Sequence, residues 1–185
     1  MQIQAQELLD MAEASGKLAT FDIEATGLKG DYNGILVVSV KPFGQKPISL
    51  TCTKPGDDKK LVAEARDLLS QYSIWVSYYG KMFDEKMLNT RLFFHGLKSM
   101  PSTLHLDLYW ALKSKLLTAR RSMAHYSRWM ATPSQKMDMS PQEWNDVLSN
   151  PKKHLPMMVR RCEADVQELE DLYKRSRHLV KEFTR

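Results

Sequence analysis

The sequence has little cysteine and no long apolar run. Its two cysteines, Cys52 and Cys162, do not have the spacing of a zinc site. We therefore expect two reduced, buried thiols, which excludes a disulfide scaffold. No stretch approaches the roughly 20 apolar residues of a transmembrane helix. The N-terminus also lacks the basic, apolar and small-residue order of a signal peptide. These absences predict a soluble protein of the cytoplasm, with no membrane partner.

The sequence also lacks internal repeats, low-complexity tracts and a linker rich in glycine, serine or proline. A length of 185 residues fits one domain, and we predict that this domain spans residues 1–185. The hydrophobic fraction of 43% is enough for one sizeable core. The net charge of +5 permits an anionic partner such as nucleic acid. A solvated basic surface is equally compatible with that charge.

The order of apolar patterns predicts an α/β domain. We expect five strands, at residues 17–24, 35–40, 48–53, 74–79 and 103–108. Helices are predicted at residues 3–15, 59–72, 84–96, 108–117, 118–131, from Ser140 onward, and at 157–183. The segments 108–117 and 118–131 are either two helices or one bent helix. Three strands joined by short turns precede strands that alternate with helices, so the predicted sheet is mixed and begins as an antiparallel meander.

Two acids lie in the apolar run of the first predicted strand. Asp22 and Glu24 are two positions apart, so their side chains would project from the same face. Two close like charges are costly to bury unless a cation compensates them. Carboxylate oxygens are hard ligands that suit Mg²⁺ or Mn²⁺. The alternative is a strand end at which water solvates both acids.

Two further acids lie where they could join this pair. Asp84 occupies a strand-to-helix junction, the edge at which open α/β sheets bind ligands, although it could equally be a helix cap. Asp165 lies beside the apolar stripe of the last predicted helix, where a buried salt bridge to an arginine is the alternative. If the four acids converge, they form the ligand set of a two-metal phosphodiesterase site.

Three segments that carry these acids resemble the motifs of a known family. "FDIEATGL" (21–28), "YYGKMFDEKMLNTRL" (78–92) and "RCEADVQELEDLY" (161–173) occur in family order. They resemble the three motifs of the DEDD superfamily of 3′→5′ exonucleases, which have a ribonuclease H-like fold. The nearest resemblance is to the exonuclease domains of family B DNA polymerases and their stand-alone bacterial and phage relatives. It extends over about residues 17 to 175.

The resemblance implies a fold and a set of functional residues. The implied fold is α/β and ribonuclease H-like, with a five-stranded mixed sheet flanked by helices. Two ions, Mg²⁺ or Mn²⁺, are expected on the four acids, and Thr26, Gly27 and Leu28 are expected to line the 3′-terminal nucleotide. Beside the second acid motif, Tyr79 and Phe83 are candidates for substrate binding by stacking. Tyr78 is a further candidate, and one or two of the three rings are expected in the core.

The sequence departs from the family pattern at two places. Gly80 stands where the family often has asparagine. Arg161 and Arg160 stand where the family usually has tyrosine or histidine, which orients the attacking water or takes its proton. An arginine stays protonated and cannot take that proton, but Arg161 could orient the scissile phosphate. Three alternatives remain: the metals alone lower the pKa of water, His154 or Tyr79 reaches the site, or activity is low or lost.

A basic and aromatic segment follows the fifth predicted strand. Such a mixture suits single strands, because bases stack on rings while phosphates meet cations. A helix with an apolar core face and a solvated basic face is the alternative. The residues concerned are Lys113, Lys115, Arg120, Arg121, His125, Tyr126, Arg128 and Trp129. Nearby, we predict that Asp107 caps a helix.

The predicted activity is a metal-dependent 3′→5′ exonuclease that hydrolyses single-stranded nucleic acid to nucleoside 5′-monophosphates. DNA is expected as substrate ahead of RNA, and a polymerase or another replication or repair protein is a candidate partner. Two alternatives stay open: a non-catalytic nucleic-acid-binding module on the same fold, and an endonuclease of the same superfamily.

Overall fold

Five strands form one mixed sheet in the computed structural model, which describes residues 4–54, 56–134 and 137–180. The strand order is β3-β2-β1-β4-β5. β1 pairs antiparallel with β2, and β2 with β3, whereas β1 and β4, and β4 and β5, are parallel. The predicted meander and mixed sheet are therefore confirmed. The strands are β1 Leu18–Ala25, β2 Ile35–Pro42, β3 Ile48–Thr51, β4 Ile74–Ser77 and β5 Leu104–Asp107.

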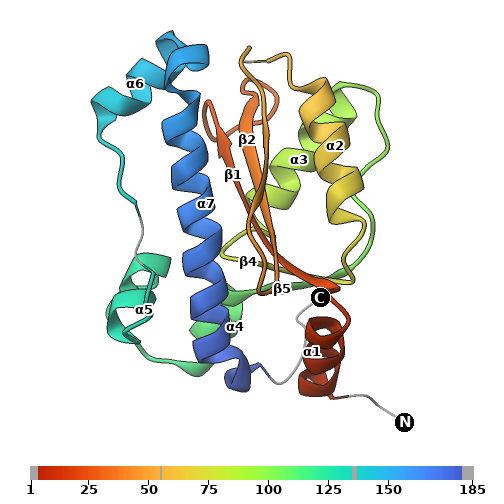
Figure 1. Cartoon of the computed structure of the whole chain (residues 1–185), viewed down its shortest axis with the longest axis vertical. Coiled ribbons are helices and arrows are strands. Elements are labelled where there is room, and N and C mark those ends of the chain that lie inside the picture. The colour runs from red at the N-terminus through yellow and green to blue at the C-terminus, as the bar shows by residue number, and fades with distance from the viewer. Residues whose placement is uncertain (1–3, 55, 135–136, 181–185) are drawn as a thin grey trace.

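Helices cover both faces of the sheet (Figure 1). The long helix α7 packs against β1 and β2 on one face, and α2 and α3 pack on the other. The helices are α1 Ala5–Ala14, α2 Lys59–Leu69, α3 Asp84–Phe94, α4 Leu108–Lys115, α5 Met123–Trp129, α6 Pro141–Ser149 and α7 Pro151–Ser176, followed by the 3₁₀ helix η1 Arg177–Leu179. The predicted α/β fold with a five-stranded mixed sheet between helices is confirmed.

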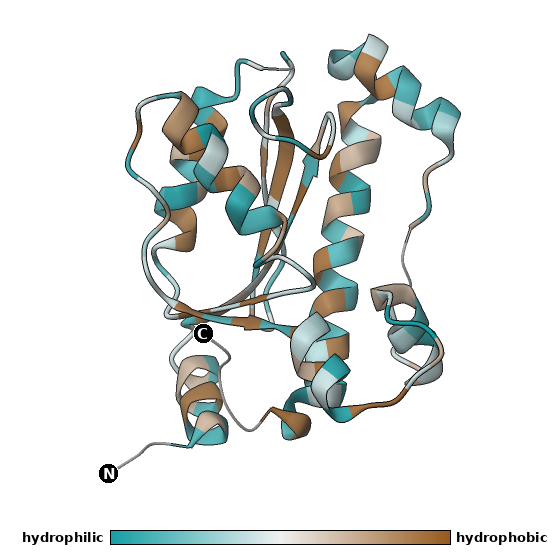
Figure 2. Cartoon of the chain, turned by 180° about the vertical axis from the view of Figure 1, so that it is seen from behind, coloured by the Kyte–Doolittle hydropathy of each residue, from teal (hydrophilic) through white to brown (hydrophobic). Residues whose placement is uncertain are grey.

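The alternation of side chains along β1 divides the interior. Ala19, Phe21 and Ile23 join the core cluster under α2 and α3. Asp22 and Glu24 therefore take the opposite face, toward α7. From behind, Figure 2 shows hydrophobic residues on the strands between the two helical layers and a mixture of both kinds along α7. The central strand is thus apolar on one face and acidic on the other.

Some helix boundaries differ from the prediction because of local capping. The last long helix begins at Pro151 rather than near residue 157, where the Asn150 side chain accepts a hydrogen bond from the backbone N–H of Lys153. Residues 108–131 form two helices, α4 and α5. The second begins only after Ser122, whose side chain caps it. The place of Asp58 directly before a helical pattern suggests that it caps α2. Asp58 does occupy the N-cap position, but its side chain makes no capping hydrogen bond.

Parts of several predicted segments lie outside the described residues. They are residue 3 of the first helix, Pro55, residues 135–136 of a loop and residues 181–183 of the last helix. Both cysteines are free and buried, as predicted. Among the described residues, no helix has the length and apolar composition that crossing a membrane requires.

Candidate active site

Asp22 and Glu24 face α7 from the central strand. α7 is fixed there by the Thr20 hydroxyl, which donates to the carbonyl of Val166 at 3.0 Å. The Cys162 thiol lies 3.5 Å from Asp22 Oδ2. Glu24 is buried and Asp22 is half-buried. The predicted projection of both acids from one face of the strand brings them under the long helix.

Asp84 reaches the same place from the start of α3. Its Oδ1 accepts a hydrogen bond of 3.1 Å from the backbone N–H of Ile23, the residue between the two strand acids. The preceding loop passes close to this carboxylate. A Cβ atom on Gly80 would lie 3.3 Å from Asp84 Oδ2 and 2.5 Å from the Cβ of Ser77. Packing against Ser77 therefore leaves no room for a side chain at the position where the resembled family often has asparagine.

Asp165 and Arg161 complete the group from α7. The Arg161 guanidinium forms an ion pair with Glu24 and lies 3.6 Å from Asp165 Oδ2. It also lies over the ring of Trp144 in α6, 5.7 Å from the ring centroid. The structure thus realises the salt bridge between Asp165 and an arginine that was the alternative to a metal ligand, and it places this salt bridge among the other acids. We call Asp22, Glu24, Asp84 and Asp165 the carboxylate site.

Burial and repulsion between the acids govern the pKa values in the carboxylate site. Burial raises the pKa of Asp22 well above its usual value, and Asp84, Glu24 and Asp165 raise it further, while Arg161 lowers it. Burial likewise raises the pKa of Asp84, to about 7, although its hydrogen bond from Ile23 opposes the change. Burial opposes the charged form of Arg161, yet its carboxylate neighbours raise its pKa overall. Arg161 is therefore a cation that interacts with Asp22, Glu24 and Asp165.

The oxygen donors of the site fit a divalent cation. Among the described residues, Asp22, Glu24 and Cys162 offer ligand atoms that lie within 4.8 Å of one another. Asp84 and Asp165 border this group. Burial raises the pKa of the Cys162 thiol well above its usual value. Carboxylate oxygens are the ligands that Mg²⁺ and Mn²⁺ prefer.

The sequence prediction did not include Cys162, which lies beside the carboxylate site. It precedes Asp165 by three residues, so the two share a helix face. That spacing was the signal that could have placed it beside the acids. Trp144, which contacts Arg161, had no such signal, because it comes from a different helix.

The loop after β1 contains three predicted substrate-binding residues. It folds back on itself: Thr26 N–H donates to the carbonyl of Gly34, and Thr26 Oγ1 accepts from Gly34 N–H at 3.1 Å. Gly27 packs against the side chain of Asn33, so closely that a Cβ atom would lie 2.5 Å from Asn33 Oδ1. Leu28 is 79% exposed. The loop thus leaves an apolar side chain open to a ligand.

The three aromatic residues before Asp84 have different surroundings. Tyr78 and Phe83 are half-buried against core clusters, whereas Tyr79 is 43% exposed. Tyr79 has a positive φ of 64°, which costs a non-glycine residue on the order of 1–3 kcal/mol. Asp107 holds this conformation by accepting hydrogen bonds from the N–H groups of Tyr79, at 2.8 Å, and Lys81, at 3.1 Å. Its predicted role as a helix cap is confirmed, since it also accepts from Tyr109 N–H.

The predicted basic and aromatic segment divides between the core and the surface. Arg120, His125, Arg128 and Trp129 line one pocket of about 380 Å³. Tyr126 is fully buried in the core, while Trp129 is 59% exposed on α5. Lys113 lies on α4, with its ammonium 4.5 Å from the ring centroid of Trp110. The backbone carbonyl of Arg121 accepts the hydroxyl of Tyr78. The segment therefore contributes to both the core and the surface.

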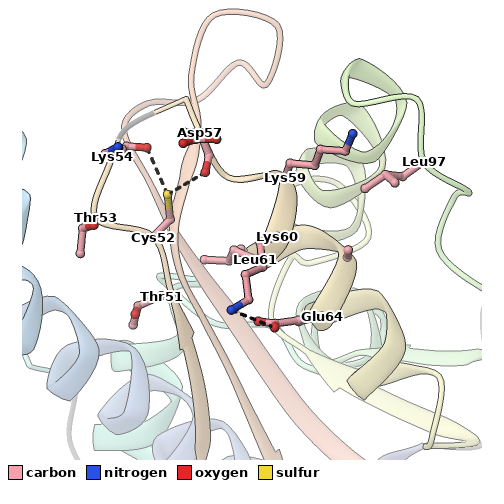
Figure 3. A pocket seen from close by; sticks show the side chains of 11 residues that line it. Thr51, Cys52, Thr53, Lys54, Asp57, Lys59, Lys60, Leu61, Glu64 and Leu97 are labelled. Atoms are coloured by element: carbon pink, nitrogen blue, oxygen red, sulfur yellow. Dashed lines mark hydrogen bonds and ion pairs between the residues drawn. The ribbon is translucent and has the colours of Figure 1, made fainter.

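A separate pocket of about 680 Å³ lies between the end of β3 and the start of α2 (Figure 3). The Cys52 thiol in its wall donates toward the backbone carbonyls of Lys54 and Asp57. Lys60 and Glu64, also in the wall, approach within 3.7 Å of each other. The residues that line it include none of the predicted site residues, so this pocket is separate from the carboxylate site.

The fold agrees with comparisons to known proteins. A sequence profile of the RNase_H superfamily matches residues 19–177. The chain belongs to this superfamily. No curated protein sequence matches it.

Two solved structures of low sequence identity share the fold of this RNase_H superfamily chain. One is a family B DNA polymerase from the hyperthermophilic archaeon Pyrobaculum calidifontis, with a TM-score of 0.70 and 15% identity over 86% of this chain. The chain spans about a quarter of that polymerase, 24% of its length. The other is described as the apo form of a nuclease, with a TM-score of 0.60, 18% identity, and coverage of 95% of this chain and 79% of that one.

Proposed function

We propose that this chain is a metal-dependent 3′→5′ exonuclease that hydrolyses single-stranded nucleic acid and releases nucleoside 5′-monophosphates. The observation that carries the proposal is the meeting of four carboxylates from β1, α3 and α7 at one place, with Arg161 paired to two of them. The three sequence segments that supply them are those that resemble the exonuclease motifs. Membership of the RNase_H superfamily and the shared fold with a nuclease support this assignment.

Asp22, Glu24, Asp84 and Asp165 would hold two Mg²⁺ or Mn²⁺ ions. When bound, such ions lower the pKa of water and stabilise charge on a phosphate during in-line displacement. The chain contributes the negative charge that attracts them, in a site where burial strengthens electrostatic interactions. The raised pKa values of Asp22 and Asp84 agree with this role, because burial and the neighbouring acids both disfavour the charged carboxylates, and a bound cation would favour them.

Arg161 cannot act as the proton acceptor, because its carboxylate neighbours stabilise its charged form. In this proposal it holds Glu24 and Asp165 in position and contributes positive charge near the phosphate. The Tyr79 ring contacts Tyr109 and Trp110, so in this proposal it binds substrate and does not activate water. His154 precedes Arg161 by seven residues of α7, about 10 Å along the helix axis. Activation of water by the metals themselves therefore ranks ahead of these side chains.

Thr26, Gly27 and Leu28 would contact the terminal nucleotide, and the exposed side chain of Leu28 suits an apolar contact with a base or sugar. Tyr79 and Phe83 remain predicted substrate contacts, with Tyr79 the more exposed of the two. DNA ranks ahead of RNA, since the chain shares the fold of part of a DNA polymerase. A polymerase or another replication or repair protein is the proposed partner class.

The test uses 5′-labelled linear single strands of DNA and of RNA with Mg²⁺ or Mn²⁺. We expect a ladder that shortens from the 3′ end and is absent for Asp165→Asn. The matched control is Asp171→Asn, which changes another buried acid of α7 whose carboxylate accepts from Ser134 instead. If Asp165→Asn and Asp171→Asn degrade the strand equally, the assignment of the site is wrong.

Circular single strands distinguish an endonuclease from the proposed exonuclease, since an exonuclease cannot begin on a circle. Cleavage of circles would replace the proposed activity. The non-catalytic alternative is favoured by one observation, the ion pairs through which Arg161 partly neutralises Glu24 and Asp165. It predicts that the chain binds single strands and yields no product with either metal. Arg161→Tyr would then test whether the family residue restores hydrolysis.

A further inference from the structure

Three aromatic rings gather beside the carboxylate site, contributed by two segments of the chain. Tyr79 comes from the loop between β4 and α3, and Tyr109 and Trp110 come from the first turn of α4. The rings of Tyr79 and Trp110 are stacked, with centroids 6.3 Å apart and an angle of 29°. Tyr109 meets both rings edge-on, at 4.9 Å from Tyr79 and 5.0 Å from Trp110. We call these three rings, together with Lys113, the aromatic platform.

The aromatic platform is partly open to solvent and carries a positive charge. Tyr79 is 43% exposed, and Tyr109 and Trp110 are half-buried. The ammonium of the exposed Lys113 lies 4.5 Å from the centroid of Trp110 and 5.7 Å from that of Tyr109. A cation over aromatic faces can meet a phosphate while the rings meet a base.

The backbone connects the aromatic platform to the carboxylate site. Asp107 accepts hydrogen bonds from the N–H groups on both sides of Gly80, those of Tyr79 and Lys81. Gly80 itself packs against Asp84, since its Cβ position is 3.3 Å from Asp84 Oδ2. The same loop therefore carries a proposed metal ligand at one end and an exposed ring in a strained conformation at the other. Core packing does not explain why the Tyr79 ring faces outward.

We propose that the aromatic platform binds unpaired nucleotides on the 5′ side of the terminal nucleotide held at the carboxylate site. The polarity of the strand rests on the proposed exonuclease function. Bases would stack on the exposed ring faces, and Lys113 would contact the backbone phosphate. A base in a duplex has both faces covered by its neighbours. The aromatic platform thus selects single strands over duplexes and has little preference for sequence.

The experiment measures binding of a fluorescent oligothymidylate by anisotropy, in EDTA so that no strand is cut. Trp110→Ala should weaken binding by about 5- to 150-fold for one lost stacking contact. Because Trp110 is half-buried, the exposed Lys113→Glu is a second variant that leaves the core intact and should also weaken binding. Binding of thymidine 5′-monophosphate, which has no nucleotide on the 5′ side of the terminal one, should stay unchanged. The matched control is Phe93→Ala, which removes an exposed aromatic ring from α3 and should bind like the wild type.

The proposal is overturned if Lys113→Glu and a folded Trp110→Ala, checked by circular dichroism, bind the long strand as tightly as the wild type. It is also overturned if both variants weaken the binding of thymidine 5′-monophosphate to the same extent. Hydrolysis with Mn²⁺ separates this inference from the proposed function. If the wild type binds strands through the aromatic platform but yields no product, the proposed exonuclease activity is wrong, while the proposed binding by the aromatic platform is supported.

Discussion

Two groups of buried acids in this protein are built from the same residue types and balanced in opposite ways. In the first, Asp58 is fully buried and accepts hydrogen bonds from Arg91, at 2.7 Å, and from the backbone N–H of Ile35, at 2.8 Å, while His95 Nε2 lies 2.7 Å away. We call Asp58, Arg91 and His95 the Asp58 clamp. In the second, the carboxylate site, Arg161 interacts with Asp22, Glu24 and Asp165 among the four acids.

The pKa values express this difference. Burial acts to raise the pKa of Asp58, but the hydrogen bonds from Arg91, Ile35 and His95 together lower it. The pKa values of Asp22 and Asp84 are raised instead. An acid whose charge is neutralised can connect parts of the fold. Arg91, the partner of Asp58, also donates hydrogen bonds to the carbonyls of Gly30 and Gly56 in two loops. An unbalanced group of acids lowers stability and favours the binding of a cation.

The largest expected effect is on catalysis at the carboxylate site. Asp22→Asn should reduce hydrolysis about a thousandfold or more, because metal ions contribute several kcal/mol to the transition state. Fold stability without metal should not fall, since the substitution removes a repelling charge. Rates on a labelled strand and urea denaturation measure the two quantities. A large loss of stability would show that Asp22, like Asp58, stabilises the fold.

The next effect is on stability at the Asp58 clamp. Asp58→Asn leaves Arg91, which is 3% exposed, without its charged partner and should lower the free energy of unfolding by about 3–5 kcal/mol. Urea denaturation measures the loss. The control is Asp67→Asn, since the Asp67 side chain is 68% exposed. Equal stability of the two variants would contradict the structural role of Asp58.

Metal binding should stabilise the carboxylate site and leave the Asp58 clamp unaffected. Mn²⁺ at about 100 times its dissociation constant should add about 2.7 kcal/mol to the free energy of unfolding. Asp84→Asn should lose most of this increment because it removes a ligand, whereas Asp58→Asn should keep it. Thermal denaturation with and without Mn²⁺ gives the comparison. Loss of the increment in Asp58→Asn would show that the two groups are coupled.

Arg161→Gln sharpens the comparison by making the carboxylate site less balanced. Arg161 competes with a cation for Glu24 and Asp165, and hydrogen bonds to charged groups contribute about 1.5–3 kcal/mol. The variant should bind Mn²⁺ about tenfold more tightly or better, as measured by isothermal titration calorimetry. Unchanged affinity would show that Arg161 does not compete with the metal.

The smallest effect is a dependence of stability on pH. The pKa of Asp58 is lowered in the folded protein, and its unfolded value is about 3.9. The unfolded chain therefore takes up a proton first as pH falls. The stabilisation by Asp58 is complete above about pH 5 and is lost as pH falls through the folded pKa. The stability difference between wild type and Asp58→Asn should shrink below about pH 4. A constant difference would contradict the lowered pKa.

Much of the carboxylate site follows from local patterns. The period of two along a strand predicts that Asp22 and Glu24 share a face, and the strand-to-helix junction predicts the position of Asp84. The spacing of three residues between Cys162 and Asp165 could also have predicted that Cys162 lies near Asp22. The Asp58 clamp was missed, because its partners lie 23 to 37 residues away along the chain and a helix cap explained Asp58 more simply.

The sequence by itself determined the element types, the mixed sheet and the acids that converge, because hydrophobic periodicity and turn residues act over a few positions. Only the tertiary structure decided how those acids are balanced. Arg161 reaches Glu24 because α7 packs across β1, and Tyr79 turns outward because Asp107, 28 residues later, holds its backbone. Charge balance depends on distances between segments far apart in the chain, and those distances exist only after the sheet and helices have packed.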